Sequence, residues 1–217
     1  MYDLEQAITE RHSTRMFLPD KPVPAELVQE ALDLAMRAPS NSNIQPWHVV
    51  LASGPARDRL VAALLKEAKS APPKVPVLPE AFAHMRSDLG KLVYGSMGIA
   101  REDKDARAQA VLRNWEFFKA PLAGIVCMHR DLDYVDAMGV GMFLQTLLLA
   151  LTARGLGTCV QVSIAGYPGI VRDQLNLSED MRVLCGLAIG YPDPAFPANN
   201  LWVPRNPTDS NVALVDR

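Results

Sequence analysis

The stretch "PSNSNIQPWHVV", residues 39 to 50, joins a polar loop to the start of a strand. Serine, asparagine and glutamine fill five of its first seven positions, and it holds none of the glycine, aspartate or lysine common in surface loops. Amides and hydroxyls form hydrogen bonds without carrying charge. Pro46 and Trp47 then lead into an apolar run that predicts a strand over residues 46 to 52. The loop is therefore a candidate binding segment beside a sheet.

Helix-like and strand-like patterns alternate on both sides of this stretch, which predicts a layered α+β or α/β domain. Helices are expected over residues 2–12, from Val23-Pro24 to about Pro39, over 55–69, over 137–153 and over 167–176. Buried strands are expected over residues 121–128, 158–166 and 181–192.

The segment from residue 70 to residue 118 departs from this pattern. It begins with "SAPPKVPVLPE", whose four prolines exclude a helix or a central strand, and then returns to helix-like spacing. We expect one domain over residues 1 to 217 with a lid-like insertion at about 70 to 118, although a solvated helical excursion explains the segment equally well. As a lid, it would line a substrate pocket through its aromatic residues, which are Phe82, Tyr94, Trp115, Phe117 and Phe118.

Residues 137 to 153, "AMGVGMFLQTLLLALTA", form an apolar run without a charged residue. A membrane-spanning helix needs about 20 apolar residues, so the run lies at the lower limit, and Gln145, Thr146 and Thr152 weaken that interpretation further. A helix that is apolar on all sides must be covered on all sides in a soluble protein. We therefore expect a core helix and no membrane contact, with the cover provided more easily by a dimer than by one subunit.

Composition and motifs exclude several functional classes. The net charge of −2 argues against nucleic-acid binding, which needs a basic surface. The sequence has no GxxxxGK[ST], GxSxG or HExxH motif, and its four histidines lack metal-ligand spacing, so no metal site is expected. Three cysteines without CxxC spacing and an acidic N-terminus, unlike that of a signal peptide, predict free buried thiols in a cytoplasmic protein.

A second polar motif, "RHSTR", covers residues 11 to 15. It places two guanidinium groups, of Arg11 and Arg15, around the hydroxyls of Ser13 and Thr14. Such donors suit a phosphate group. Taken alone, the motif is better explained by the end of a helix, where the helix dipole favours basic residues.

Together, the two motifs resemble those of the nitroreductase family of flavin enzymes. The family shares an Arg-x-Ser-x-[Arg/Lys]-x-Phe segment, matched by residues 11 to 17, and a Pro-Ser-x-x-Asn-x-Gln-Pro-Trp loop, matched by residues 39 to 47. The resemblance extends along nearly the whole chain, including the apolar helix, the Gly155-Leu156-Gly157 segment that ends this helix, and Arg205. It implies an α+β fold with a mixed β-sheet flanked by helices, in an intertwined homodimer that binds FMN at its interface.

The resemblance also implies roles for particular residues. Arg11, Ser13 and Arg205 would hold the FMN phosphate. Arg15 would lie near N1 and O2 of the flavin ring, where a fixed cation stabilises the reduced form. Backbone N–H groups near residue 163 would face N5 and O4, and the loop of the other subunit would reach the same flavin. The candidate cofactor contacts are Arg11, His12, Ser13, Arg15, Pro39, Ser40, Asn41, Asn43, Val162, Ser163, Ile164 and Arg205.

This chain departs from many relatives at three places. A second basic residue before the tail arginine is replaced by Val203, so phosphate binding is expected to depend more on Arg11 and Arg205. The Glu-Gly pair of several relatives at the N5 turn corresponds here to Val162-Ser163. The amide and the base that relatives supply after the second strand cannot be placed in the proline-rich stretch.

The implied chemistry is a ping-pong reaction in which NAD(P)H passes a hydride to flavin N5 and leaves before a nitroaromatic or a quinone is reduced. It needs no catalytic acid from the protein, which positions and tunes the flavin. Two alternatives on the same scaffold remain open: a flavin-dependent reductive dehalogenase, and a non-catalytic protein that sequesters FMN. The preference between NADH and NADPH is also open.

Overall fold

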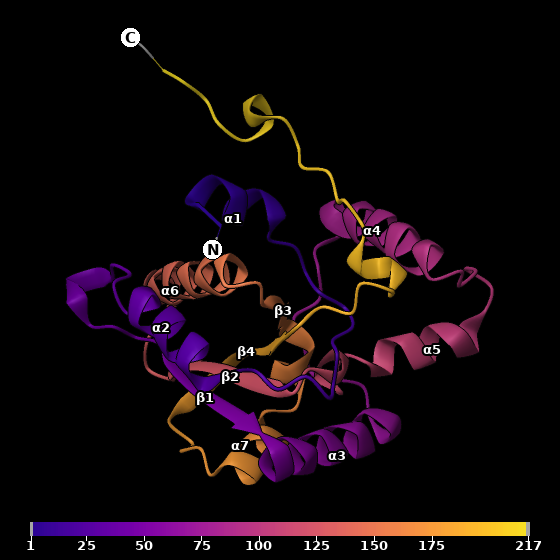
Figure 1. The fold of residues 1–217 in the computed structure, drawn as a ribbon, viewed down its shortest axis with the longest axis horizontal. Coiled ribbons are helices and arrows are strands. Elements are labelled where there is room, and N and C mark those ends of the chain that lie inside the picture. Colours follow the sequence, from indigo (N-terminus) through magenta and orange to yellow (C-terminus); the bar gives the residue numbers. More distant parts are fainter. Residues whose placement is uncertain (1, 216–217) are drawn as a thin grey trace.

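A four-stranded sheet in the order β1-β2-β4-β3 forms the middle of the computed structural model, which describes residues 2 to 215 (Figure 1). Every strand pair in this sheet is antiparallel. The resemblance implied a mixed sheet, but the only parallel pairing among the described residues is an isolated bridge between Ser13 and Thr158, outside the named strands. The strands are β1 (His48–Ser53), β2 (Leu122–His129), β3 (Gly157–Gln161) and β4 (Met181–Gly190).

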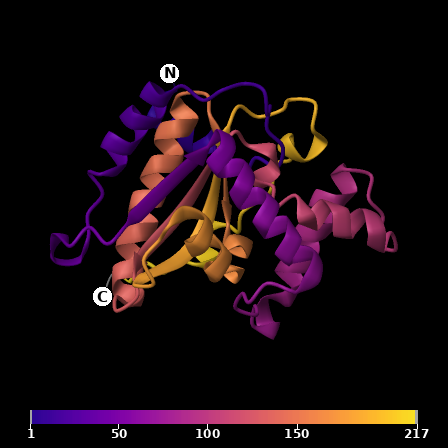
Figure 2. The same cartoon turned by 90° about the horizontal axis from the view of Figure 1, so that it is seen from below.

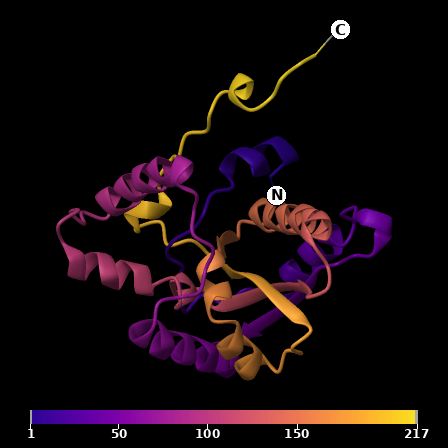
Figure 3. The same ribbon diagram turned by 180° about the vertical axis from the view of Figure 1, so that it is seen from behind.

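Helices cover both faces of the sheet, which confirms the predicted α+β fold. In Figures 2 and 3, α2 and α6 lie on one face, and α3 and α7 lie on the other. The helices are α1 (Leu4–Glu10), α2 (Ala25–Ala35), α3 (Gly54–Ser70), α4 (Ala83–Ser96), α5 (Lys104–Leu112), α6 (Tyr134–Ala153) and α7 (Pro168–Leu175). The short 3-10 turns are η1 (Asn41–Asn43), η2 (Glu80–Phe82), η3 (Phe117–Lys119), η4 (Val162–Gly166), η5 (Pro197–Asn199) and η6 (Thr208–Ser210).

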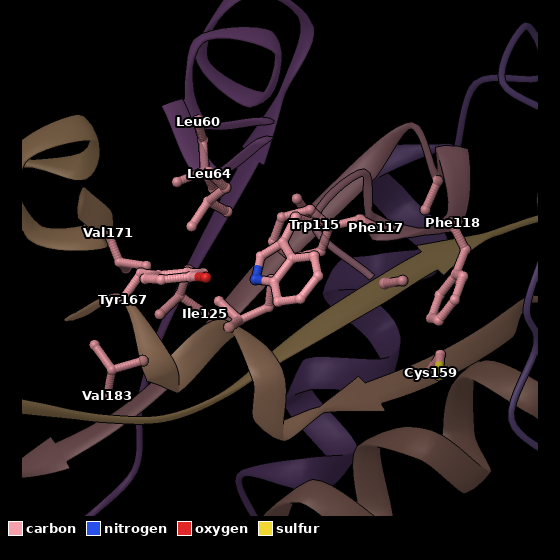
Figure 4. Close-up of a cluster of buried hydrophobic side chains, with 14 of the residues drawn as sticks. Leu60, Leu64, Trp115, Phe117, Phe118, Ile125, Cys159, Tyr167, Val171 and Val183 are labelled. Atoms are coloured by element: carbon pink, nitrogen blue, oxygen red, sulfur yellow. The ribbon is translucent and has the colours of Figure 1, made fainter. Parts of the chain in front are cut away.

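The alternation of side chains along β2 divides the interior into two cores. Ile125 and Cys127 face α3 and α7, whereas Val126 and Met128 face α2 and α6. A strand that is buried on both faces reads as a continuous apolar run. This is why residues 121 to 128 were recognisable as a strand without an alternating pattern. Figure 4 shows the core on the α3 and α7 side, where the Trp115 ring lies beside Tyr167 with centroids 5.9 Å apart.

Helix α6 is longer than the apolar pattern predicted, because it begins at Tyr134 and not at Ala137. Asp133 and Asp136 form a capping box that starts the helix three residues earlier. By length and composition, α6 could cross a membrane, but core helices meet the same criteria. Here one face of α6 packs on the sheet through Val140, Phe143 and Leu147.

The other face of α6 is not covered within the subunit, contrary to the need for cover on all sides. Tyr134, Met138 and Met142 are exposed there. Helix α1 packs beside α6 and exposes Leu4 and Ile8. We call this set of five side chains the α1–α6 apolar surface. A surface of this kind marks an interface when it is contiguous.

The segment after α3 lies partly outside the layers. Residues 71 to 79 are neither helix nor strand, as their prolines predicted. Helix α4 has no buried residue, and Figure 1 shows α4 and α5 projecting from one end of the sheet. Trp115, Phe117 and Phe118, however, belong to the core on the α3 and α7 side. The excursion from the core therefore ends near residue 112. The rings of Trp115, Phe117 and Phe118 are packed in the core, so they are not parts of a mobile lid.

The three cysteines are free and buried, as the sequence predicted. Burial raises the pKa of Cys127 to about 11 and that of Cys185 to about 12, and the pKa of Cys159 is also raised to about 11.

At pH 8 the native thiols should therefore react with a disulfide reagent at least about a hundredfold more slowly than the thiols of the protein unfolded in urea, because thiolate is the reactive form. Release of chromophore from Ellman's reagent measures this, and rapid reaction of one native thiol would contradict it.

Candidate active site

The first motif lies in extended chain along the edge of β3. Helix α1 begins after Asp3, whose side chain accepts a hydrogen bond from the N–H of Gln6 at 2.8 Å, and it ends at Glu10. The prediction of a helix to residue 12 was therefore too long. Ser13 then bridges to Thr158, and the N–H of Thr14 donates to the Thr158 carbonyl at 2.9 Å. Of the residues in this motif, only Arg11 lies at the end of α1, as its C-cap. The helix dipole therefore explains the basic residue at position 11 but not the one at position 15.

Arg11 lies within electrostatic reach of Arg205, although the two residues are 194 positions apart in the sequence. Burial and the nearby charge of Arg205 both lower the pKa of the Arg11 guanidinium. Neither arginine forms an ion pair with a carboxylate in residues 2 to 215. Arg11 is half-buried and Arg205 is exposed. The two like charges repel each other, and an anion between them would relieve the repulsion.

Arg15 is fixed through its backbone and its side chain. Its N–H donates to Asn199 Oδ1 at 2.6 Å, and its Nη1 donates to the Ser13 carbonyl at 3.1 Å. Asn199 is buried, and its Nδ2 also donates to the Met16 carbonyl at 2.8 Å. Asn199 therefore positions the motif from η5. Sequence reasoning missed this residue, because a single asparagine in a tail rich in proline and asparagine gives no signal.

Cys159 lies behind the first motif. Burial raises the pKa of its thiol to about 11, although nearby Arg15, Ser13 and Arg11 act in the opposite direction. The thiol is therefore neutral at physiological pH, and thiolate is the nucleophilic form. This agrees with the absence of a nucleophile among the candidate residues.

The turn after β3 is the 3-10 turn η4, so the strand predicted over residues 158–166 ends at Gln161. The reason is packing: Ile164 is buried, and a Cβ on Gly186 would lie 2.5 Å from its Cγ1. The first N–H groups of such a turn, from Val162 to Ile164, have no carbonyl partner within it. The Ser163 hydroxyl is buried and has no hydrogen-bond partner among the described residues. The N–H groups lack a partner in the turn, whereas the Ser163 hydroxyl is enclosed by the protein.

The proline-rich stretch lies against η4, which the sequence could not reveal. The N–H of Lys74 donates to the Gly166 carbonyl at 3.1 Å. A Cβ on Gly166 would lie 2.5 Å from Pro73 Cβ, so this close approach requires glycine. Lys74 is thus a basic residue beside the turn, in the segment where we could not place the base that relatives supply.

The second motif forms an exposed loop with a stiff base. Pro46 and Trp47 are buried, and the Trp47 ring stacks on Phe143 of α6 with centroids 4.9 Å apart. Above this base, Ser42, Asn43 and Gln45 adopt positive φ angles of 49°, 54° and 49°. Non-glycine residues rarely hold this conformation, and residues that do so cluster at functional sites.

The two motifs lie at opposite ends of the subunit. Figures 1 and 2 show the loop between α2 and β1 far from α4, α5 and η5. One subunit therefore brings together Arg11, Ser13, Arg15 and Arg205 around β3, and η4 follows that strand. It does not bring Pro39, Ser40, Asn41 or Asn43 to them. His12 is exposed, and its Nδ1 lies 2.8 Å from the Glu10 carbonyl.

Comparison with known proteins identifies the family of this chain. The family model described as the nitroreductase family matches residues 8–191. The chain belongs to the nitroreductase family. This confirms the resemblance inferred from the two motifs, and both lie within the matched residues. Arg205 lies outside the matched range of this nitroreductase-family chain, so its assignment depends on its position near Arg11.

Three relatives illustrate the membership. A 4-nitrobenzoate reductase from Pseudomonas putida is 35% identical over 209 residues, which cover 94% of this nitroreductase-family chain and 91% of the relative. The crystal structure of the FMN and NADPH-dependent nitroreductase NfnB from Sphigopyxis sp. strain HMH has a TM-score of 0.94 at 30% identity, with 100% of both chains covered. The FMN-dependent nitroreductase NfnB from Mycobacterium smegmatis, in complex with NADPH, has a TM-score of 0.91 at 32% identity, with 98% and 97% covered.

Proposed function

We propose that this protein is an FMN-dependent NAD(P)H nitroreductase that works as a homodimer. The observation that carries the proposal is the half-buried guanidinium group of Arg11, which feels the charge of Arg205, while neither arginine pairs with a carboxylate among the described residues. Guanidinium groups bind phosphate oxygens through parallel N–H donors. Family membership and the FMN named for two similar structures support the choice of this phosphate ligand.

The residues around β3 fit the rest of FMN. Arg15 would place a fixed positive charge at the pyrimidine edge of the ring, which favours an anionic reduced state. The N–H groups of η4 would donate toward the ring atoms N5 and O4, and the buried Ser163 hydroxyl offers a further donor or acceptor. FMN supplies the two-electron chemistry when bound, so no side chain is assigned as a catalytic acid. His12 stays a candidate contact near the phosphate.

The distance between the two motifs supports a site built by two subunits. Pro39, Ser40, Asn41 and Asn43 form an exposed loop at the end of the subunit that is remote from Arg15. In a symmetric dimer, the loop of one subunit would reach the flavin held by its partner. The α6 part of the α1–α6 apolar surface, around Met138, lies beside the base of this loop, because neighbouring Gly139 approaches Ser40 and Pro46. Burial of this surface in the dimer would cover α6 completely.

The reaction we propose follows a ping-pong order. NAD(P)H would bind first, give up a hydride and leave as NAD(P)+, and a nitroaromatic or quinone acceptor would then use the same open face and take up the electrons. In this scheme the protein excludes water, orients the two reactants in turn and holds positive charge near the ring.

A direct experiment tests the proposed activity. The purified protein should be yellow, and anaerobic NADPH or NADH should bleach its absorption near 450 nm. Addition of nitrobenzene should restore the colour, and initial rates at several NADPH concentrations should give parallel double-reciprocal lines. A flavin that is bound but not bleached by either nicotinamide would show an FMN-sequestering protein and would refute the enzymatic proposal.

Substitution of Arg11 by alanine tests the phosphate site. The loss of a charge-assisted hydrogen bond should weaken FMN binding by about 1.5–3 kcal/mol. Riboflavin, which lacks the phosphate, should bind Arg11→Ala and the parent protein with similar affinity. Quenching of flavin fluorescence on titration into apoprotein measures both affinities. Arg59→Ala, at an exposed position of α3, is the control, and an equal loss for FMN and riboflavin would remove Arg11 from the phosphate site.

A further inference from the structure

A second set of arginines lines a cavity outside the group of residues assigned to FMN. The cavity has a volume of about 680 Å³ and lies between α4, α5 and the segment that carries Arg15. Arg15 is the only FMN candidate that lines it, and no aspartate or glutamate does so within the described part of the chain. Its basic side chains are Arg15, Arg86, Lys91, Arg101, Arg107 and Arg113.

Most of this positive charge is not neutralised by the protein. Lys91 pairs with Asp88 at 2.9 Å, but none of the five arginines forms an ion pair in residues 2 to 215. The Arg107 guanidinium lies 4.1 Å from the centre of the Tyr94 ring. The Arg113 guanidinium lies 5.4 Å from the Phe196 ring, and its Nη1 lies 3.2 Å from Met97 Sδ.

These partners leave Arg107 and Arg113 without a strong oxygen acceptor among the described residues. Arg107 and Arg113 are half-buried, so their charges are only partly hydrated. A ring face and a thioether sulfur attract a cation, but they accept hydrogen bonds weakly compared with a carboxylate. A guanidinium in such surroundings gains from an anionic ligand that brings its own oxygen atoms.

The remaining walls of the cavity are apolar and aromatic. Tyr94, Phe118 and Phe196 supply rings, and Met97 and Ile99 supply aliphatic surface. On α4, Gly95 leaves unfilled space at the cavity wall, because a Cβ at this position would have no other atom within 4 Å. A volume of this size is typical of sites for small organic molecules. The lining therefore suits a ligand with a flat apolar body and an anionic end.

We propose that this cavity selects electron acceptors that carry a carboxylate on an aromatic ring. The inference rests on the proposed function and names the substrate class of that site. The carboxylate binds at Arg107 and Arg101, and the ring lies against Tyr94 and Phe118. The reducible group then points toward Arg15, which lines both the cavity and the proposed flavin site.

The phosphates of a nicotinamide dinucleotide are the other source of anionic oxygen atoms. In a nicotinamide dinucleotide the phosphates are flanked by polar sugars, whereas the cavity combines guanidinium groups with aromatic walls. This combination favours the aromatic carboxylate, and the experiment below separates the two sources.

The test measures binding to oxidised holoprotein without any reductant, so that no turnover occurs. The probes are 4-nitrobenzoate and its neutral analogue 4-nitrobenzamide, titrated by calorimetry. Arg107→Gln should weaken 4-nitrobenzoate binding about tenfold or more, the scale of one charged hydrogen bond, and should leave 4-nitrobenzamide within about twofold. Arg101→Gln should act in the same direction, and Arg107→Lys should restore part of the affinity. Arg59→Gln on the outside of α3 is the matched control.

Two results would overturn the proposal. One is an unchanged ratio of 4-nitrobenzoate to 4-nitrobenzamide affinity in both glutamine variants. The other is a rise in KM for NADPH, but not for NADH, with unchanged 4-nitrobenzoate binding, which would assign the cavity to the nicotinamide phosphate. The proposed enzymatic function fails separately, through a lack of NAD(P)H oxidation by a protein that still binds 4-nitrobenzoate through Arg107.

Discussion

Met138→Asp is expected to convert the protein from a dimer into a monomer that no longer retains FMN. Met138 lies on the α1–α6 apolar surface with 59% of its side chain exposed, so the change should not disturb the interior of a single subunit. In a symmetric dimer the new carboxylate would be buried twice against apolar side chains. Each such burial costs several kcal/mol, which should raise the dimer dissociation constant by a factor of about a thousand or more.

The loss of FMN follows from the separation of the two motifs. A monomer keeps Arg11, Ser13 and Arg205, but it lacks the partner loop that contains Asn41 and Asn43. Light scattering with simultaneous absorption at 450 nm measures mass and flavin content together. Val77→Asp, at a residue that is 91% exposed in the proline-rich stretch, is the control. A Met138→Asp protein that stays dimeric would place the interface elsewhere, and a yellow monomer would show that one subunit is sufficient for the site.

Phe117→Ala should cost about 3–5 kcal/mol of unfolding free energy, as expected for removal of a fully buried aromatic ring. Phe117 is 0% exposed, and its ring packs against the backbone of Gly186. In addition, Phe117, Phe118 and Lys119 all adopt positive φ angles, between 50° and 65°. These strained residues depend on the surrounding packing to hold their conformation.

Urea unfolding followed by circular dichroism measures this change. Parent and variant must be compared at equal protein and FMN concentrations, because ligand binding and association both shift the apparent stability. Phe82→Ala is the matched control, since Phe82 lies in the same excursion but is 49% exposed. A loss for Phe117→Ala no larger than that for Phe82→Ala would show that the end of the excursion is not part of the core.

The sequence predicted the elements whose local patterns match their burial. Strand β2 is apolar throughout because both of its faces are covered, and the two polar motifs stood out because charged and amide side chains are rare beside buried strands. The family and the α+β fold followed from these motifs. The ends of elements were less accurate, because they depend on single caps and contacts, such as Asp133 at α6 and Ile164 on Gly186.

Features that arise from distant parts of the chain were not predictable from local patterns. The approach of Arg205 to Arg11, the anchoring of Arg15 by Asn199 and the position of Lys74 beside η4 all depend on tertiary packing. The same reason explains why residues 113 to 118 were grouped with a lid. Their sequence is amphipathic and charge-rich, and only the three-dimensional structure shows which rings face the interior.

The left-handed residues of the polar loop also bear on how tightly two subunits would associate in the proposed dimer. Ser42, Asn43 and Gln45 already have their unusual backbone angles in a single chain, and Trp47 fixes the loop base on α6. A preorganised loop loses little conformational entropy when it meets its partner, so more of the contact energy appears as affinity. Glycine at residue 43 would tolerate the same φ angle but would leave the free loop more disordered. Assembly would then become weaker without the loss of any contact.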